Sequence, residues 1–309
     1  MHGVFGFLMA GVSPEPPSER EVPPLPPHVA MEILFLGEAG GPSRSCISGN
    51  DGERIGCGIR LRYANDSAAR RVALDLYART GTVVGLLPEQ DFAGGYRGVV
   101  HLVPRLPVGT ARKHLQWTAA ALLDYDDFFR RLGGAPNFRW LALALRFFRS
   151  PGRRTPSAFA TDWTIAYNVN GSLFGSATGV RGTLFHEIFH LNDAAHGRWS
   201  ARALAPTFDA IVAKCGVRTA CLARYTPASL MVKGGTYYAF QPGNGVREYG
   251  AELARRYYEE QRAVLHGGVV SRPFKCAAPE NLLVWSLLVR EFFGGVDRVG
   301  ACKADPVSR

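Results

Sequence analysis

Residues 186–190 read His-Glu-Ile-Phe-His and place two imidazoles and a carboxylate in one short segment. If this segment is helical, His186 and His190 lie one turn apart on the same face, so both rings can reach one metal ion. Glu187 follows the first histidine and could act as the general base toward a zinc-activated water molecule. The spacing therefore predicts a catalytic zinc site with two histidine ligands and a glutamate base.

The residues around this motif have the periodicity of a helix with one apolar stripe. The stripe repeats at helical spacing and consists of Val180, Leu184, Ile188 and Leu191. The two histidines fall on another face, together with Thr183. Without a metal, two half-buried histidines and a glutamate would leave polar groups in need of partners. We therefore expect a helix that is anchored by its apolar stripe and offers both histidines to a metal.

This helix resembles the active-site helix of the zincin metallopeptidases, which carry the HExxH motif there. The resemblance is close over the motif helix and looser after it, and nothing before about residue 160 contributes to it. It implies one Zn²⁺ per chain, a protein or peptide substrate and hydrolysis by the zinc-activated water. It also implies an α+β fold of the zincin type, in which a mixed sheet is combined with the HExxH helix and a helical C-terminal half.

Catalytic zinc usually takes three protein ligands and a water molecule, so the motif needs a third ligand. One candidate is His196, because the spacing from His186 matches the HExxHxxGxxH pattern of the metzincins. In that family the glycine lets the chain turn the third histidine back to the metal. Here the glycine position holds Asp193, preceded by Asn192. Both residue types enter left-handed conformations more readily than most, so the turn remains accessible but is less favoured.

The second candidate is Glu248, near the start of a helix predicted over residues 247–265, with Glu252 one turn further on the same face. The pair resembles the Glu-x-x-Ala-Glu pattern of the gluzincins, particularly protease domains of the lethal factor type. In that arrangement the first glutamate binds zinc and the second orients a histidine ligand. The alternative is an ordinary exposed helix with many charges. The zinc ligands that we predict are His186, His190 and Glu248.

Two adjacent tyrosines, Tyr237 and Tyr238, precede this second helix. A tyrosine hydroxyl there could donate to the oxyanion that forms when water attacks a peptide carbonyl. Enzymes of the lethal factor type place a tyrosine shortly before the glutamate ligand. The resemblance therefore favours Tyr238 as a catalytic residue, whereas the alternative is that both rings only pack in the core.

The rest of the chain predicts strands early and helices late. The expected strands are residues 82–87, 98–103, 140–147 and 163–169. The expected helices are residues 66–80, 109–132, 201–214, 247–265 and 279–293, together with the motif helix. Residues 46–63 are rich in glycine, and we expect them to be irregular. Residues 163–171 are either a sheet-edge strand that pairs with an extended substrate or a strand of the core.

The N-terminus has a composition unlike the rest. A short apolar run at residues 4–12 is followed by a Pro-rich stretch. We interpret residues 1–30 as the remnant of a secretory signal or a disordered Pro-rich linker. Residues 31–309 are expected to form one zincin-like metallopeptidase domain.

Six cysteines fall into three pairs that are close in sequence: Cys46 with Cys57, Cys215 with Cys221, and Cys276 with Cys302. None has CxxC spacing, which argues against a second, structural zinc site. An even number in local pairs is typical of disulfides in an oxidising compartment. We therefore expect a secreted or periplasmic protein, and the alternative is a cytoplasmic protein with free thiols.

The formal net charge is +10, but the arginines are spread along the chain and no nucleic-acid-binding module is recognisable. We expect no nucleic-acid partner, and no apolar run is long enough for a membrane span. The sequence leaves the oligomeric state open. The predicted function is a zinc metallopeptidase with Glu187 as general base. Two alternatives remain: an inactive zincin-like binding or effector protein, and a zinc amidase that acts on cell-wall crosslinks.

Overall fold

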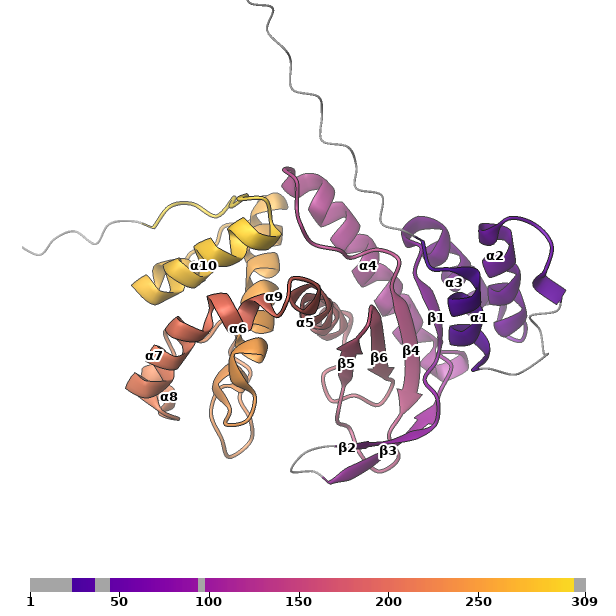
Figure 1. Ribbon diagram of the computed structural model, residues 1–309, viewed down its shortest axis with the longest axis horizontal. Coiled ribbons are helices and arrows are strands. Elements are labelled where there is room, and N and C mark those ends of the chain that lie inside the picture. Colours follow the sequence, from indigo (N-terminus) through magenta and orange to yellow (C-terminus); the bar gives the residue numbers. More distant parts are fainter. Residues whose placement is uncertain (1–23, 37–44, 94–97, 303–309) are drawn as a thin grey trace, which may run out of the picture.

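A mixed β-sheet lies between two groups of helices in the computed structural model, which describes residues 24–36, 45–93 and 98–302 (Figure 1). Strand β4 is central and pairs in parallel with β6 on one side and with β1 on the other. The end of β4 also pairs with β3, which is antiparallel to it and forms a hairpin with β2. The strands are β1 (Val83–Leu86), β2 (Gln90–Ala93), β3 (Val99–Pro104), β4 (Ala144–Arg149), β5 (Ala158–Thr161) and β6 (Thr164–Asn168).

Helices make up the structure before β1 and after β6, and no strand follows β6 among the described residues. The first group is α1 (Pro27–Phe35), α2 (Asp51–Arg62) and α3 (Ser67–Thr80), and a further helix, α4 (Arg112–Leu132), follows β3. The second group is α5 (Ala177–Ala195), α6 (Trp199–Ala203), α7 (Ala205–Cys215), α8 (Thr219–Leu222), α9 (Gly245–Leu265) and α10 (Pro279–Phe292). The α+β class with a mixed sheet and a helical C-terminal half is therefore confirmed.

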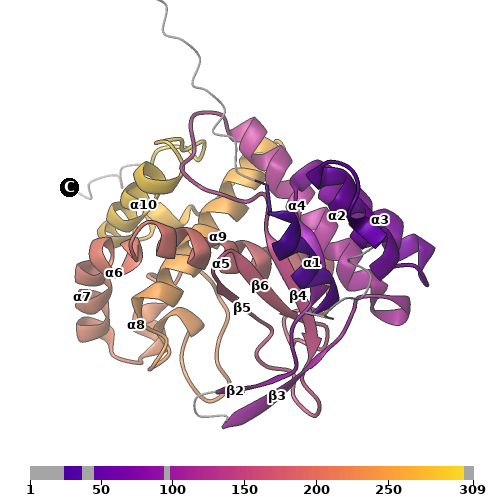
Figure 2. The same cartoon turned by 45° about the vertical axis from the view of Figure 1, so that its right-hand side comes forward.

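One face of the sheet is covered by α4. Leu145 and Phe147 of β4 lie beside Ile165 and Tyr167 of β6 in the parallel register, and all four are buried. The Tyr167 hydroxyl and Nδ1 of His114 on α4 share a hydrogen bond of 3.0 Å. Helix α5 packs against α4 and β5 and is followed by the C-terminal helices, which lie on the far side of α5 from α1–α3 (Figure 2). The motif helix is thus held between the sheet and the C-terminal helices.

The other face of the sheet is covered by α1 and by the β2–β3 hairpin. Glu32 of α1 accepts a hydrogen bond of 2.8 Å from Arg146 of β4. Gly85 of β1 lies so close to α1 that a Cβ there would be 2.0 Å from the carbonyl oxygen of Ile33. A second, smaller apolar cluster lies between the hairpin and the sheet and is built from Leu87, Val100, Leu102, Phe148 and Ala166.

Most of the expected elements are present, some with shifted boundaries. Helix α3 begins after Asp66, whose side chain accepts from the backbone of Ala69, and ends at Gly81 in the left-handed conformation. The strand expected at residues 140–147 is found at residues 144–149. The helix expected at residues 201–214 is divided into α6 and α7. Local caps and apolar periodicity account for the correct elements.

The prediction that residues 46–63 are irregular is wrong. They contain α2, which begins with a capping box: Asn50 accepts from the backbone of Glu53, and the Glu53 side chain accepts from the backbone of Asn50. One of the glycines that suggested a loop serves packing, because a Cβ on Gly58 would be 2.8 Å from the sulfur of Met31 on α1. Residues 90–93, for which no strand was expected, form β2.

The suggestion that residues 163–171 are a sheet-edge strand is also wrong. Strand β6 pairs with β4 on one side and with β5 on the other, so its backbone is already satisfied. The alternative, a strand of the core, is correct. The edge of the sheet next to α5 is β5, which pairs only with β6 among the described strands.

Helix α1 begins at Pro27, so the end of the expected linker, residues 1–30, belongs to the folded domain. Residues 1–23, which contain the apolar run at residues 4–12, lie outside the described residues. All three expected disulfides are present, Cys46–Cys57, Cys215–Cys221 and Cys276–Cys302, and they indicate an oxidising environment. In the part of the chain that the structure describes, no helix has the length and apolar character needed to cross a membrane.

Candidate metal centre

Helix α5 carries the HExxH motif and is buried on nearly all sides. It begins at a capping residue, Ser176, whose side chain accepts a hydrogen bond of 3.1 Å from the backbone of Gly179. All its residues from 182 to 193 are buried, including His186, Glu187 and His190. The helix is therefore a core element with contacts on several faces, rather than a helix with a single buried stripe. Its histidines point toward α9.

Two glycines allow close packing around the crossing of α5 and α9. A Cβ on Gly182 of α5 would lie 2.7 Å from Nε of Arg255 on α9. A Cβ on Gly250 of α9 would lie 3.2 Å from the ring of Phe189 on α5. A Cβ at either position would require a neighbouring side chain to shift, so both positions favour the residue without a Cβ. The close crossing brings the start of α9 within reach of the motif histidines.

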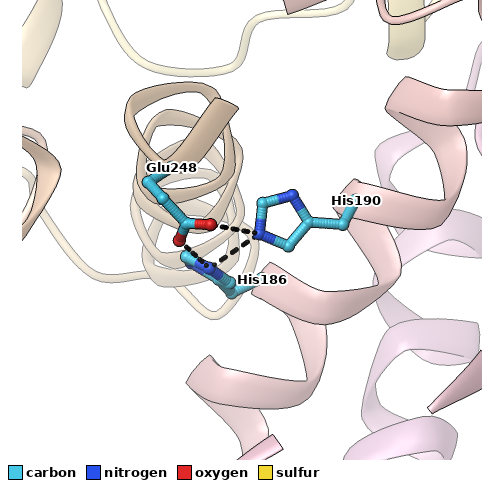
Figure 3. Close-up of side chains that lie close together, drawn as sticks. All are labelled: His186, His190 and Glu248. Atoms are coloured by element: carbon cyan, nitrogen blue, oxygen red, sulfur yellow. Dashed lines mark hydrogen bonds and ion pairs between the residues drawn. The ribbon is translucent and has the colours of Figure 1, made fainter. Parts of the chain in front are cut away.

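The structure brings the three predicted zinc ligands, His186, His190 and Glu248, to one point (Figure 3). The two histidine Nε2 atoms are 3.1 Å apart. Glu248 places one carboxylate oxygen 3.1 Å from Nε2 of His186 and the other 3.3 Å from Nε2 of His190. One ligand atom from each residue lies within 4.8 Å of the others, and within the described residues no other group of this kind is found.

This donor set fits a zinc ion. Ligand bonds of about 2.0–2.1 Å in a tetrahedral site place neighbouring ligand atoms roughly 3.3 Å apart, close to the separations found here. The cluster also attracts positive charge. Burial lowers the pKa of His186, but the carboxylates of Glu248 and Glu252 outweigh it and raise this pKa to about 10. Two imidazoles and one carboxylate are a common set of protein ligands for zinc in hydrolytic enzymes.

Glu252 supports the cluster from behind, and Arg255 supports Glu252. Oε1 of Glu252 lies 3.0 Å from Nδ1 of His186, on the side of the ring opposite the cluster. Burial would raise the pKa of Glu252, but His186 and, to a smaller extent, Arg255 outweigh it and hold this pKa below its usual value. The Arg255 guanidinium is 3.8 Å from the other Glu252 oxygen. The ionised carboxylate therefore fixes the orientation of the ring.

Tyr238 also contacts the cluster. It begins a short 3₁₀-helix, Tyr238–Phe240, and its hydroxyl donates a hydrogen bond of 2.9 Å to Glu248. Burial, followed by the charge of Glu248, raises the pKa of the phenol, so it remains a neutral donor. Tyr237, the second choice from sequence, points elsewhere and lines a separate pocket. The structure thus places Tyr238 at the cluster and Tyr237 away from it.

Glu187 is buried beside the cluster. Burial is the main cause that raises its pKa above the usual value, and the two motif histidines oppose this rise. A carboxylate whose pKa is moved toward neutrality is suited to accept and return a proton. Its place next to His186 was predicted from the motif, and its chemical role stays a prediction.

His196 is not part of the cluster. It lies at the C-terminal end of α5, where its Nδ1 is 2.7 Å from a carboxylate oxygen of Glu291 on α10. Asp193, which stands at the position of the metzincin glycine, accepts from the backbone and hydroxyl of Ser200 at 2.6 and 2.9 Å. Asp193 therefore anchors the start of α6 and does not turn His196 toward the motif.

Two residues at the site were not singled out from the sequence. Arg255 had only been counted among the charges of an exposed helix, and Gly182 had no role at all. The spacing of Glu252 and Arg255, three residues apart, is a known signal for an ion pair on a helix. No comparable signal links Gly182 to Arg255, because they meet only through the crossing of α5 and α9.

No protein-family model, no curated protein and no solved structure matches the chain.

Proposed function

We propose that this protein is a zinc-dependent metallopeptidase of the zincin type, with His186, His190 and Glu248 as the zinc ligands. The observation that carries the proposal is the convergence of their ligand atoms within 4.8 Å, next to a buried glutamate of the same motif. Three protein ligands leave one position for water or substrate, as catalytic zinc requires. A closed structural site would need a fourth protein ligand.

In this proposal zinc, when bound, would lower the pKa of a water molecule and polarise the carbonyl of the scissile bond. Glu187 accepts the proton of the attacking water and passes it to the leaving amine. Its buried position, which raises its pKa, supports both steps. Tyr238 provides a neutral hydroxyl beside Glu248 that can stabilise the negative charge developing on the carbonyl oxygen.

The choice of a peptide substrate is supported by the sheet next to the motif helix. Strand β5 packs against α5 and has β6 as its one partner among the described strands. Its other edge can pair with an extended peptide through main-chain hydrogen bonds. Three disulfides support a secreted or periplasmic location, where the substrate would be an extracellular or periplasmic protein or peptide.

A single experiment tests the proposal. The purified protein is incubated with a random peptide library, with zinc and with a chelator, beside Glu187→Gln. We expect zinc at about one ion per chain, cleavage that the chelator abolishes, and a loss of about a hundred-fold or more in Glu187→Gln, which retains its metal. The proposal would be refuted if the wild-type protein bound no zinc after reconstitution. It would also be refuted if Glu187→Gln cleaved peptides as fast as the wild type.

A further inference from the structure

A cavity lies apart from the metal cluster, along α9 and the C-terminal segment. It has a volume of about 870 Å³, within the range of about 300–1,000 Å³ typical of ligand sites. Its walls come from the loop after α8, from α9, from residues 268–277 and from residues 298–301. Of the residues already discussed, it includes Tyr237 and excludes every predicted zinc ligand.

The charged side chains that line this cavity, which we name the arginine pocket, are all arginines: Arg224, Arg256, Arg272 and Arg298. Among the described residues, no aspartate or glutamate lines the pocket. Arg256 has an acidic partner outside the lining, Glu260, at 2.6 Å. Arg298 donates to the carbonyl of Leu132 and has no ion pair with a carboxylate among the described residues. Because like charges gathered in one cavity repel each other, the pocket favours an anionic occupant.

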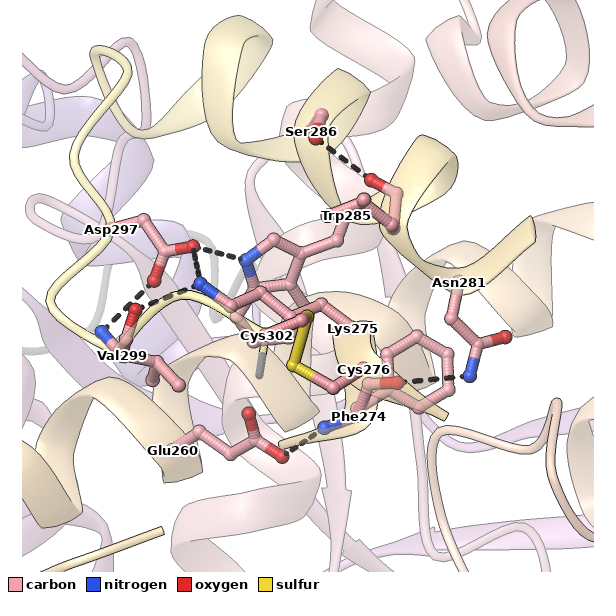
Figure 4. The surroundings of a disulfide bond; sticks show 11 residues. Glu260, Phe274, Lys275, Cys276, Asn281, Trp285, Ser286, Asp297, Val299 and Cys302 are labelled. Carbon is pink, nitrogen blue, oxygen red and sulfur yellow. Dashed lines mark hydrogen bonds and ion pairs between the residues drawn. A yellow bond between two sulfur atoms is a disulfide. The ribbon is translucent and has the colours of Figure 1, made fainter. Parts of the chain in front are cut away.

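The acidic residues nearest to this wall are already engaged with other partners (Figure 4). Asp297 accepts from Lys275 at 2.7 Å and from the indole of Trp285 at 2.8 Å. Glu260 accepts from the backbone of Phe274 at 2.9 Å. The disulfide Cys276–Cys302 joins the segment that carries Phe274 and Lys275 to the segment that follows Asp297. These hydrogen bonds, ion pairs and the disulfide hold the wall together. Asp297 and Glu260 therefore do not neutralise the charges of Arg224 and Arg272.

The rest of the lining is apolar or small. Valine, proline and phenylalanine side chains form the apolar part: Val264, Val269, Val270, Pro273, Phe274 and Val299. Most of the other lining residues are alanine, serine or glycine, including Ala228, Ser229, Ala277 and Gly300. Small residues let a main chain approach the wall, while guanidinium groups bind carboxylates through paired hydrogen bonds. Carboxylates on a chain with apolar side chains would complement this surface.

We propose that the arginine pocket binds an acidic peptide segment. As a segment of the substrate it would act as an anchoring site outside the metal centre, and this part of the inference rests on the proposed function. The two sites are physically joined. The pocket residue Tyr237 precedes Tyr238, which contacts Glu248, and the backbone of Tyr238 donates a hydrogen bond of 2.8 Å to Leu230, next to the pocket residue Ser229.

Binding can be tested without any hydrolysis. A fluorescein-labelled, glutamate-rich peptide with a central leucine is titrated with the full chain in the presence of chelator, and anisotropy is measured. We expect a micromolar dissociation constant that rises with salt, because exposed charge contacts are screened. The matched peptide with glutamine in place of glutamate should bind at least about ten-fold more weakly. Binding under chelation separates this inference from the proposed zinc chemistry.

Matched variants locate the binding site. The pair Arg224→Gln and Arg272→Gln removes two exposed pocket charges that have no carboxylate partner within the described residues, and it should weaken binding about ten-fold. The pair Arg153→Gln and Arg154→Gln removes the same charge from an exposed turn elsewhere and should leave affinity unchanged. The proposal would be overturned if both pairs of variants lost affinity equally, or if the glutamine peptide bound as tightly as the glutamate peptide. It would also be overturned if free phosphate or citrate displaced the labelled peptide as effectively as the unlabelled peptide does.

Discussion

Nδ1 of His186 lies 3.0 Å from Oε1 of Glu252, which follows Glu248 by one turn of α9. One helix thus provides both a carboxylate at the ligand face of the His186 ring and a carboxylate at its opposite face. A carboxylate at this distance favours a proton on Nδ1 of His186, which in the proposed zinc site would leave Nε2 free to bind the metal. This relationship leads to the first prediction.

Replacing Glu252 with glutamine should weaken zinc binding about ten- to a hundred-fold, because the neutral amide orients His186 less strongly. The measurement is a competition titration against a chromophoric chelator. Asp209→Asn is a suitable control, since Asp209 is an exposed acid on α7. Equal zinc affinities for Glu252→Gln and wild type would contradict a supporting role for this carboxylate.

The choice of the third ligand can be tested by comparing Glu248→Ala with His196→Ala. Glu248→Ala removes the carboxylate that faces both histidines and should reduce zinc affinity more than Glu252→Gln does. His196→Ala removes a contact with Glu291 on α10 and should leave zinc affinity close to that of the wild type. The same chelator titration measures both. The opposite ranking would assign the third ligand to His196.

Tyr238→Phe should retain zinc but lower kcat by about ten- to a thousand-fold, because the hydroxyl that donates to Glu248 is lost from the reaction site. Steady-state kinetics on a peptide identified from the library would measure this change. Tyr249→Phe is the matched control, since its buried hydroxyl has no hydrogen-bond partner in the described part of the structure. Similar kcat values for the two variants would remove Tyr238 from the mechanism.

Gly85→Ala should destabilise the fold by on the order of 1–3 kcal/mol or more, because overpacking forces the backbone to move. The added Cβ would lie 2.0 Å from the carbonyl oxygen and 2.5 Å from the carbonyl carbon of Ile33, both in the backbone of α1. Urea unfolding followed by circular dichroism measures the change. In Gly175→Ala the added Cβ meets nothing within 4 Å, and its stability should stay within about 1 kcal/mol of the wild type.

Stability should fall as the pH drops from about 6.5 to about 4, partly through His114. Burial, followed by the charge of Lys113, lowers the pKa of folded His114 to about 4, whereas the unfolded pKa is about 6.5. Between these values the unfolded state binds more protons, so acidification favours unfolding. His114→Gln should show a smaller loss over this window in urea titrations at several pH values. Parallel pH profiles for variant and wild type would contradict this assignment.

The sequence by itself determined the parts of the protein that depend on neighbours along the chain. The helix that carries His186, Glu187 and His190 follows from a spacing of four residues and an apolar stripe, both of which are local properties. The helix with Glu248 and Glu252 and the three short-range cysteine pairs were predicted for the same reason. Local composition was misleading at residues 46–63, which contain α2, and where Gly58 allows close packing against Met31 rather than forming a loop.

Only the tertiary structure decided which acidic or imidazole group meets the motif. From the sequence, the resemblance to the gluzincins favoured Glu248, but His196 was nearer to His190 and remained the alternative ligand. The fold separates His196 by pairing it with Glu291, and it brings Glu248 in through the crossing of α9 over α5. Such a crossing depends on packing between segments that are far apart in the chain, such as Gly182 and Arg255. Hydrophobic periodicity and motif spacing do not predict such contacts, because both are properties of a single segment of the chain.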